Sequence, residues 1–312
     1  MKRQIRFRDL HGIVLLDKPL GLSSNQALQV VRKSIFRAEK GGHTGALDPL
    51  ATGLLPLCLG EATKIAGMLL GSRKAYLAEC RLGVTTSTAD LEGEIVQERP
   101  VPALTDEAIE QALAKLRGRI TQVPPAYSAI KRDGERLYLK ARRGEAIDVP
   151  AREVEVNRLD LVSRSGDTLT LHVECGSGTY VRSLAVDLGE DLGCGAHLTG
   201  LRRLWVEPFR EPAMVTLEQL RELAGQGDEA LLATLLPVSA GLSDLPALHL
   251  DVARSLAVSQ GQQIALEAPM AGQFAVFADD GRLLALGEDA GGKLRIVRGF
   301  NLPSTGQYAV SP

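Results

Sequence analysis

The chain has 312 residues, 45% of them hydrophobic and 24% charged, a composition typical of a soluble globular protein with room for one large domain and a small one. Its four cysteines are widely separated and form no C-x-x-C pair, which argues against a zinc site or a disulfide framework and for a reducing compartment. The sequence has neither a signal-peptide pattern nor an apolar run of membrane-spanning length, so we expect a cytoplasmic protein.

The formal net charge of −2 speaks against a nucleic-acid partner, but the charges are distributed unevenly. Residues 213–292 carry 11 acidic and 3 basic side chains, whereas residues 1–212 have a net charge of +3. Basic side chains cluster at residues 2–8, 131–143 and 202–210. A phosphate backbone would respond to such local clusters, so a basic groove for RNA is compatible with this composition.

The first predicted elements are a strand and a helix. Gly12–Leu16 is a short apolar strand. Ser23 or Ser24 can then cap an amphipathic helix, whose apolar face consists of Ala27, Leu28, Val31 and Ile35.

Residues 41–53 hold four glycines, two threonines, one histidine and one carboxylate between two apolar runs, which predicts a long, shaped loop. Pro49 pushes Asp48 toward an extended conformation, so the carboxylate is presented from a fixed backbone instead of a helix face. Neither a Walker A pattern nor G-x-G-x-x-G is present in this loop, so it is not a nucleotide loop of the usual kind.

Downstream of this loop, apolar patterns predict a buried strand at Leu54–Leu59, a helix at Ala62–Leu70 and a strand at Lys74–Leu82 that contains Tyr76. A helix over residues 105–117 follows, capped by Thr105. Further on, residues 124–144 interleave tyrosines with six basic groups at 131–143. Such a mixture suits RNA, because rings stack on bases and cations meet phosphates, but it also fits a solvated charged surface.

Two alternating strands are predicted near Val154–Val162 and Thr168–Cys175, and the chain then turns into a helix that begins near Arg182. A cation in the first turn of a helix is unfavourable against the helix dipole, so Arg182 requires an anionic partner. Residues 194–200 form a small-residue connection, and residues 216–236 predict two helices.

From Pro246 onward the chain predicts a separate tail of short strands with a hairpin turn at residues 279–281. Lys293 and Arg295 are two apart on a predicted strand and so share one face, where they could hold RNA. Arg298 breaks this alternation and joins them only if the strand ends or bulges first.

Several segments together resemble one family, the bacterial tRNA pseudouridine synthases that modify uridine 55 of the T-loop. The longest is GGHTGALDPLATGLLPLCLGEATK, residues 41–64. The others are DKPxGxSS from Asp17, LGxxTxTxDxxG from Leu82, PPxYSAxKxxGxxLYxxARxG from Pro124, GTYxR from Gly178 and LRRL from Leu201. The tail more weakly resembles the small β-barrel RNA-binding module called PUA.

The resemblance implies roles for individual residues. Asp48 corresponds to the catalytic carboxylate, and Arg182 to the arginine that pairs with it and would keep it ionised in an apolar pocket. The remaining roles concern the RNA: His43 contacts it and helps to fill the gap left by the extracted base, Tyr76 stacks on the target base, Tyr180 lies over the active site and Leu201 lines the base pocket. We assign no catalytic role to the LGxxTxTxDxxG segment.

The resemblance also implies an α+β fold with a mixed, mainly antiparallel central sheet flanked by helices. Residues 1–245 would form the catalytic domain, with an RNA-contacting insertion at 105–152, and residues 246–312 the PUA-like, β-barrel-like module. The expected partner is the T-stem-loop of tRNA; no membrane or protein partner is implied, and a monomer is expected. Isomerisation of uridine involves no redox or phosphoryl step, so no cofactor and no metal are expected.

The chemistry leaves alternatives open. Asp48 could act as a nucleophile at the sugar or assist a proton transfer through a glycal route. A non-catalytic RNA-binding or chaperone protein on the same fold is a second possibility, and a glycosidase or nucleoside hydrolase using Asp48 is a third. Hydrolases of that kind generally use two cooperating carboxylates, whereas this motif offers one together with an arginine and aromatic rings, which favours isomerisation.

Overall fold

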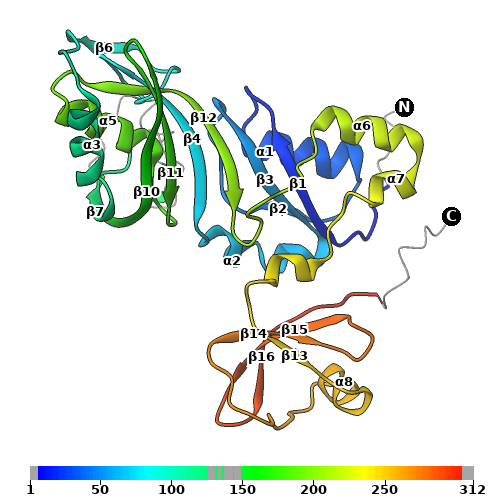
Figure 1. Cartoon of the computed structure of the whole chain (residues 1–312). Helices are drawn as coiled ribbons and strands as arrows, with labels where there is room; N and C mark the ends of the chain where they lie inside the picture. Colours follow the sequence, from blue (N-terminus) through cyan, green and yellow to red (C-terminus); the bar gives the residue numbers. More distant parts are fainter. Residues whose placement is uncertain (1–5, 126–130, 133–134, 137–142, 144–148, 304–312) are drawn as a thin grey trace.

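The computed structural model describes residues 6–125, 131–132, 135–136, 143 and 149–303. A large sheet and a separate small sheet form two parts of the molecule (Figure 1). Both tyrosines of the predicted RNA-contacting insertion, Tyr127 and Tyr138, and two of its cations, Lys140 and Arg142, lie outside the described residues. Within the part that the structure describes, no helix is long and apolar enough to cross a membrane.

The large sheet confirms the predicted mixed, mainly antiparallel architecture. Its strands lie in the order β1 (Gly12–Lys18), β3 (Ala51–Leu59), β12 (Ala196–Val206), β4 (Lys74–Leu82), β11 (Thr168–Cys175), β10 (Arg152–Ser165) and β7 (Gly118–Gln122), and β2 (Gly41–His43) also pairs with β3. Along this order, only β3 and β12 run parallel to each other. Their short parallel contact joins the two halves of the sheet.

The prediction of a connection at residues 194–200 is wrong, because β12 already begins at Ala196. Its first residues pair with β4, and Gly200 fits closely against Glu79, whose side chain would lie 3.0 Å from an added Cβ atom. At Gly200 the small residue therefore reflects close packing against a neighbouring strand and not a loop.

The predicted helices are present, in part with altered form. Ser23 caps α1 (Ser24–Gln29) through a capping box with Gln26, and the chain continues as the π-helical η1 (Val30–Ile35). The helix predicted at Ala62–Leu70 is split at Ile65 into the 3₁₀ helix η2 (Gly60–Lys64) and α2 (Ala66–Leu70). Among the described residues, the other helices of this part are α3 (Asp106–Lys115), α5 (Val181–Asp191), α6 (Leu217–Gln226), α7 (Asp228–Leu232) and the 3₁₀ helix η3 (Val238–Leu242).

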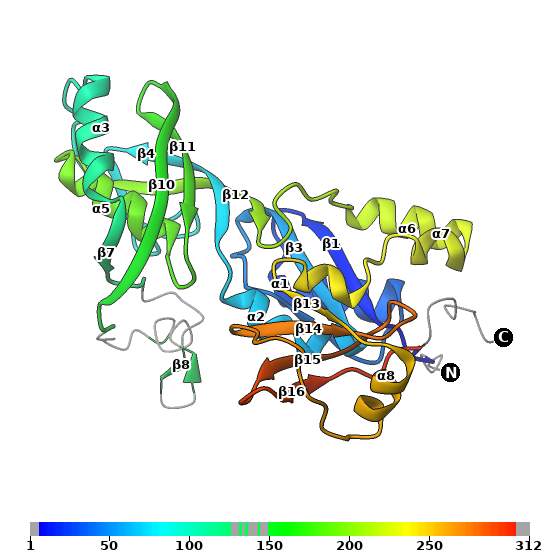
Figure 2. The ribbon, with the colours of Figure 1, turned by 60° about the horizontal axis from the view of Figure 1, so that its bottom comes forward.

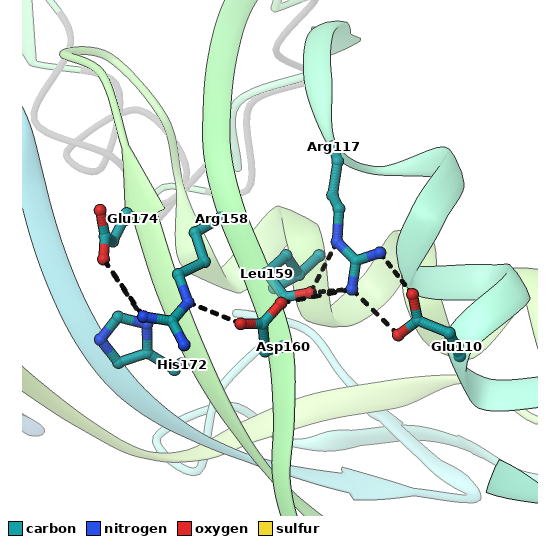
Figure 3. A network of polar contacts seen from close by, with 7 residues as sticks. All are labelled: Glu110, Arg117, Arg158, Leu159, Asp160, His172 and Glu174. Carbon is teal, nitrogen blue, oxygen red and sulfur yellow. Dashed lines mark hydrogen bonds and ion pairs between the residues drawn. The ribbon is translucent and has the colours of Figure 1, made fainter.

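At the end of the sheet that carries β7, a chain of polar contacts fastens α3 to β10 (Figure 3). The Arg117 guanidinium forms an ion pair with Glu110 and donates through Nε to Leu159 O at 2.9 Å. The chain continues over the strands through Arg158, whose Nε lies 2.6 Å from Asp160 Oδ2. These exposed pairs order the surface but contribute little to stability, since water screens them.

The tail forms a second sheet in the order β13 (Ala247–His249), β14 (Gln273–Phe277), β15 (Leu283–Asp289) and β16 (Leu294–Gly299), with α8 (Val252–Ser259) beside it. The hairpin turn predicted at residues 279–281 is confirmed, with Gly281 at φ +79° between β14 and β15. In the described part of the tail the sheet is open, because its two edge strands, β13 and β16, do not pair with each other. The expectation of a barrel-like module is corrected accordingly.

This module packs directly against the larger part of the molecule. Ala275, Leu283 and Leu286 share one buried apolar cluster with residues that include Ile13 and Leu54. Polar contacts surround this cluster: Lys64 Nζ donates to Gly299 O at 2.8 Å, and Glu61 Oε2 accepts from Asn301 N at 2.7 Å. Both views place the small sheet next to α2 and far from α3 (Figures 1 and 2).

Candidate active site

Asp48 is presented by a short loop between β2 and β3. The long loop predicted for residues 41–53 is in fact only residues 44–50, since both of its ends are strands. Ser24 anchors this loop to α1: its Oγ accepts from Leu47 N at 2.7 Å and donates to Leu47 O at 3.1 Å. The carboxylate therefore projects from a backbone that is fixed at the preceding residue.

The loop ends where β3 meets β12, and this contact requires glycine. Gly53 has φ +93°, and a Cβ atom added to it would lie 2.2 Å from Arg203 O. Any side chain at this position would push the two strands apart. The glycine thus places the Asp48 loop beside residues 201–203 of β12.

Arg182 lies in the first turn of α5 and contacts Asp48. Its Nη2 is 3.0 Å from Asp48 Oδ2, and the arginine side chain is only 5% exposed whereas that of Asp48 is 42% exposed. The anionic partner that the helix dipole requires is therefore present. A buried cation holds one side of a carboxylate whose other side is open to a substrate.

Arg182 also binds a second carboxylate, Asp90, to which sequence reasoning gave no role. Arg182 Nη1 lies 3.2 Å from Asp90 Oδ2 and donates to Thr88 O at 3.0 Å. Asp90 Oδ1 in turn accepts from Thr88 Oγ1 at 2.5 Å and from Glu92 N at 3.0 Å. Thr88 and Asp90 lie in the turn that joins β5 (Val84–Thr86) to β6 (Ile95–Glu98). The threonine and aspartate of the LGxxTxTxDxxG segment were the signal in the sequence that could have identified Asp90 as a site residue.

The electrostatics of Asp48 differ from expectation. Burial is the largest effect and raises the pKa of Asp48 above its ordinary value of 3.8; Arg182 and Lys18 oppose this, and the negative charge of Asp90 adds to it. Arg182 thus lowers the pKa as expected but does not outweigh burial. Lys18 is fully buried, donates to Pro19 O and Leu22 O, and has a pKa lowered by burial to about 8.

Tyr76 lies on β4 opposite Arg203 of β12 and is 8% exposed. Burial raises the pKa of Tyr76, and the charge of Arg203 and its hydrogen bond oppose the rise. Arg203 is itself 1% exposed and donates to Leu54 O at 2.7 Å and Gly45 O at 3.2 Å. This arginine, a second residue that sequence reasoning missed, therefore connects the Asp48 loop to the predicted stacking ring.

A further buried cation lies next to Gly45. The Cε atom of Lys74 would be 3.7 Å from a Cβ added to Gly45, and its Nζ donates to Leu70 O and Ser72 O. Burial lowers the pKa of Lys74 to about 8. Two backbone carbonyl groups thus stabilise this ammonium.

The other predicted site residues lie around this centre. His43 ends β2 opposite Leu57, at the start of the Asp48 loop. Leu201 is half-buried and pairs with Ala51 of β3 and Ala78 of β4, so it adjoins the end of the same loop. Tyr180 directly precedes α5, two residues before Arg182. Of the predicted site residues, Arg182 contacts Asp48 directly, and His43, Leu201 and Tyr180 lie on elements that adjoin the Asp48 loop or the first turn of α5.

No group of three or more His, Cys, Asp or Glu side chains that could hold a metal ion occurs among the described residues. The four cysteines are buried free thiols, and burial raises the pKa of Cys58 to about 12. What the arrangement offers chemically is one accessible carboxylate, a buried arginine and aromatic rings.

Comparisons with known proteins agree with this architecture. Residues 33–181 match the model of the TruB family pseudouridylate synthase N-terminal domain, and residues 182–243 match the tRNA pseudouridylate synthase B C-terminal domain. A protein of Xanthomonas campestris pv. campestris, strain B100, described as tRNA pseudouridine synthase B, is 59% identical over 96% of this chain and 97% of its own length. One of Xylella fastidiosa with the same description is 53% identical over 96% and 99%.

Among solved structures, a chain of a Cbf5-Nop10-Gar1 complex matches with a TM-score of 0.72 and 25% identity, over 92% of this chain and 84% of that chain. These matches, with the mixed central sheet, define the class of the protein as an RNA pseudouridylate synthase. The chain belongs to the TruB family of pseudouridylate synthases, and its activity is that of a tRNA pseudouridine synthase, an isomerase.

Proposed function

We propose that this enzyme converts uridine 55 in the T-loop of tRNA to pseudouridine, with Asp48 as the catalytic carboxylate. The observation that carries the proposal is the Arg182–Asp48 pair, in which a nearly buried guanidinium holds a carboxylate that is 42% exposed. The choice of uridine 55 rests on the resemblance of residues 41–64 to the motif of the enzymes that modify this position. The curated relatives described above support tRNA as the substrate class.

The reaction breaks the bond between N1 of uracil and C1′ of the ribose and forms a new one from C5 to C1′. The hydrogen on C5 leaves as a proton, and N1 of the rotated base gains one, so atoms and electrons balance without a cofactor. The ionised Asp48 carboxylate can attack C1′ or accept a proton from the sugar. In both routes Arg182 orients the carboxylate and leaves one of its faces free.

The base must leave the folded T-loop to reach this carboxylate, so we propose that it is flipped into the pocket. Tyr76 would stack on it, Leu201 would line the pocket from β12 and Tyr180 would cover it from the start of α5. His43 would contact the RNA and help to fill the vacated position. The convergence of these residues around one loop supports this proposal.

The burial and the contacts of Asp90 disfavour the hydrolase alternative. A hydrolase needs a second carboxylate that activates water. Asp90 is 2% exposed, and contacts to Thr88, Glu92 and Arg182 occupy its oxygens. Only Asp48 of this pair is open to solvent, which suits retention and reattachment of the base.

The wider RNA contacts are also proposed here. The insertion at 105–152 and the module at 246–312 would extend the RNA-binding surface, with the latter fixed against the catalytic domain through the cluster around Leu283 and Leu286. We propose that the enzyme acts as a monomer in the cytoplasm.

The test is an assay on a T-stem-loop RNA that carries tritium at C5 of uridine 55. We expect tritium release at a rate equal to that of pseudouridine formation, with no free uracil. The same RNA with cytidine at position 55 is the control and should release nothing. Release of free uracil would indicate a hydrolase, and tight binding without tritium release would indicate a non-catalytic RNA-binding protein.

A further inference from the structure

The start of α5 is held by a buried glutamine from β7, the last strand in the order of the large sheet. Gln122 is the last residue of β7 and is 1% exposed. Its Oε1 accepts from Tyr180 N at 2.8 Å, and its Nε2 donates to Tyr180 O at 3.1 Å. One side-chain amide thus satisfies both backbone polar groups of one residue, as a neighbouring strand would.

Tyr180 is the residue at which the chain changes from an extended loop to a helix. Its backbone is extended, with φ −103° and ψ 115°, and its side chain makes no capping hydrogen bond. Its carbonyl also accepts from Leu184 N at 3.2 Å, the first bond of α5. The direction of the first helical turn, which carries Arg182, therefore depends on how the peptide groups of Tyr180 are held.

The same rung of the sheet also contacts the ring of Tyr180. Arg152 is the cross-strand partner of Gln122 in the β10–β7 ladder. Its guanidinium carbon lies 5.0 Å from the centre of the Tyr180 ring, and its Nη2 donates to Gly178 O. Backbone and ring of Tyr180 are thus held by one pair of residues that does not reach Asp48 itself.

We propose that Gln122 is a positioning residue of this enzyme: by clamping the backbone of Tyr180 it fixes the direction in which α5 presents Arg182 to Asp48. The inference rests on the proposed role of Asp48. Gln122 is not a catalytic residue, because it is buried and Tyr180 engages both ends of its amide.

The proposal predicts a change that a purely structural residue would not cause. The charged groups that act on Asp48 are Arg182 from α5, Asp90 from the β5–β6 turn and Lys18 from β1. If the start of α5 shifts, the attraction of Arg182 weakens while burial and the repulsion of Asp90 remain. The pKa of Asp48 then rises further, and the acidic limb of the pH–rate profile moves to higher pH.

The test uses full-length Gln122→Met, which keeps the shape of the side chain but neither hydrogen bond. Single-turnover rates on the T-stem-loop at saturating enzyme are measured from pH 5 to 9. We expect the rate at pH 7 to fall roughly tenfold to a hundredfold, as for other small misplacements of catalytic groups. RNA affinity should stay within about threefold, since no RNA-contacting side chain is substituted and Tyr180 would cover only the base pocket, not the wider RNA surface. The acidic limb should move to higher pH.

Ser183→Ala is the matched control. Ser183 is in the same helical turn, is 7% exposed and donates to Val123 O at 2.8 Å, next to Gln122 in the chain. Its loss should lower the unfolding temperature without moving the acidic limb. An unchanged rate and limb in folded Gln122→Met, or an equal shift in Ser183→Ala, would overturn the proposal.

Two further variants separate the possible failures. If Gln122→Met does not fold, Gln122→Asn takes its place. This variant keeps a buried amide that is too short to reach both backbone groups of Tyr180, so the acidic limb should move to higher pH by a smaller amount. Asp48→Asn is measured in parallel. Full activity of Asp48→Asn would contradict the proposed function itself, whereas an inactive Asp48→Asn with an unaffected Gln122→Met would contradict only the role of Gln122.

Discussion

Asp48 and Asp90 bind the two ends of one guanidinium, that of Arg182, at 3.0 Å and 3.2 Å. The two carboxylates come from loops 42 residues apart and differ in exposure, at 42% and 3% of their side chains. The buried carboxylate holds one end of the guanidinium, and the accessible one keeps a face open to solvent. In the proposed catalytic centre, one buried cation therefore pairs with two carboxylates of different exposure.

Asp48→Asn should abolish turnover while RNA affinity stays within about threefold, because the exchange removes the charge and the nucleophile but keeps the shape. Single-turnover formation of pseudouridine and RNA binding by filter retention are the measurements. A rate near that of the wild type would remove Asp48 from the chemistry.

Asp90→Asn should destabilise the protein by about 3 kcal/mol, because it leaves part of the Arg182 charge uncompensated in a buried position. The pKa of Asp48 should fall, since Asp90 raises it, and the acidic limb of the rate profile should move to lower pH. Urea unfolding and the pH–rate profile test the two effects separately. Glu92→Gln is the control, because Asp90 contacts the backbone N–H of that residue and not its side chain. A limb that moves to higher pH would contradict the repulsion inferred here.

Tyr76→Leu should slow modification strongly while RNA docking persists, because stacking contributes roughly 1–3 kcal/mol per base. Tyr76→Phe is the control: it keeps the ring and loses only the hydroxyl near Arg203. Unchanged kinetics of Tyr76→Leu at saturating enzyme would show that the ring is only part of the apolar core, to which it also belongs.

Lys74 should give the protein a measurable dependence of stability on pH. Its pKa in the folded state is about 8, below the value of 10.5 of an exposed lysine, so the unfolded chain binds more protons between these two pH values. The Lys74 contribution to stability should therefore rise with pH, by about 2 kcal/mol between pH 7 and 9.5.

The measurement is the free energy of unfolding of wild type and Lys74→Met at these two pH values. The free energy of unfolding of Lys74→Met minus that of the wild type should be more positive at pH 7 than at pH 9.5. Lys64→Met, which removes an ammonium that is 33% exposed, is the comparison. A difference between wild type and Lys74→Met that does not vary with pH would contradict the low pKa.

RNA binding by the C-terminal module is better tested by point substitution than by deletion. Deleting residues 246–312 would expose the apolar cluster around Ile13 and Leu54, so a loss of RNA binding in that variant would not be specific. Point substitutions on β16 avoid this problem. The strand has a bulge between Ile296 and Arg298, which meets the condition for Arg298 to join the basic face, and Arg295 forms an ion pair with Glu288.

We therefore expect Lys293→Gln/Arg298→Gln to weaken binding of full-length tRNA and to reduce its salt dependence by about two counterions. Arg295→Gln, whose charge is already paired, should have a smaller effect. Activity on the isolated T-stem-loop should be unchanged in both variants. Equal tRNA affinity and salt slope in the double variant and the wild type would show that this face does not bind RNA.

Most of the local structure can be predicted from the amino-acid sequence. Serine caps, apolar periodicity and turn glycines act over a few residues, so the strands β1, β4, β10 and β11 and the helices α1 and α3 followed from neighbouring side chains. The requirement of Arg182 for an anion could also be derived locally, from its place in a first helical turn. The identity of that anion came from the family resemblance.

Which distant groups lie together in the site follows from the fold and could not be predicted from local patterns. Three residues act through partners that are between 58 and 158 residues away in the chain: Asp90 contacts Arg182, Arg203 contacts Gly45 and Gln122 contacts Tyr180. Asp90 was marked only by the LGxxTxTxDxxG motif. The local pattern around Arg203 and Gln122 does not predict their burial, because the partners of a buried polar side chain are brought to it by the fold. The raised pKa of Asp48 also depends on the fold. Burial raises this pKa by more than the charge of Arg182 lowers it, and the extent of burial could not be predicted from the sequence.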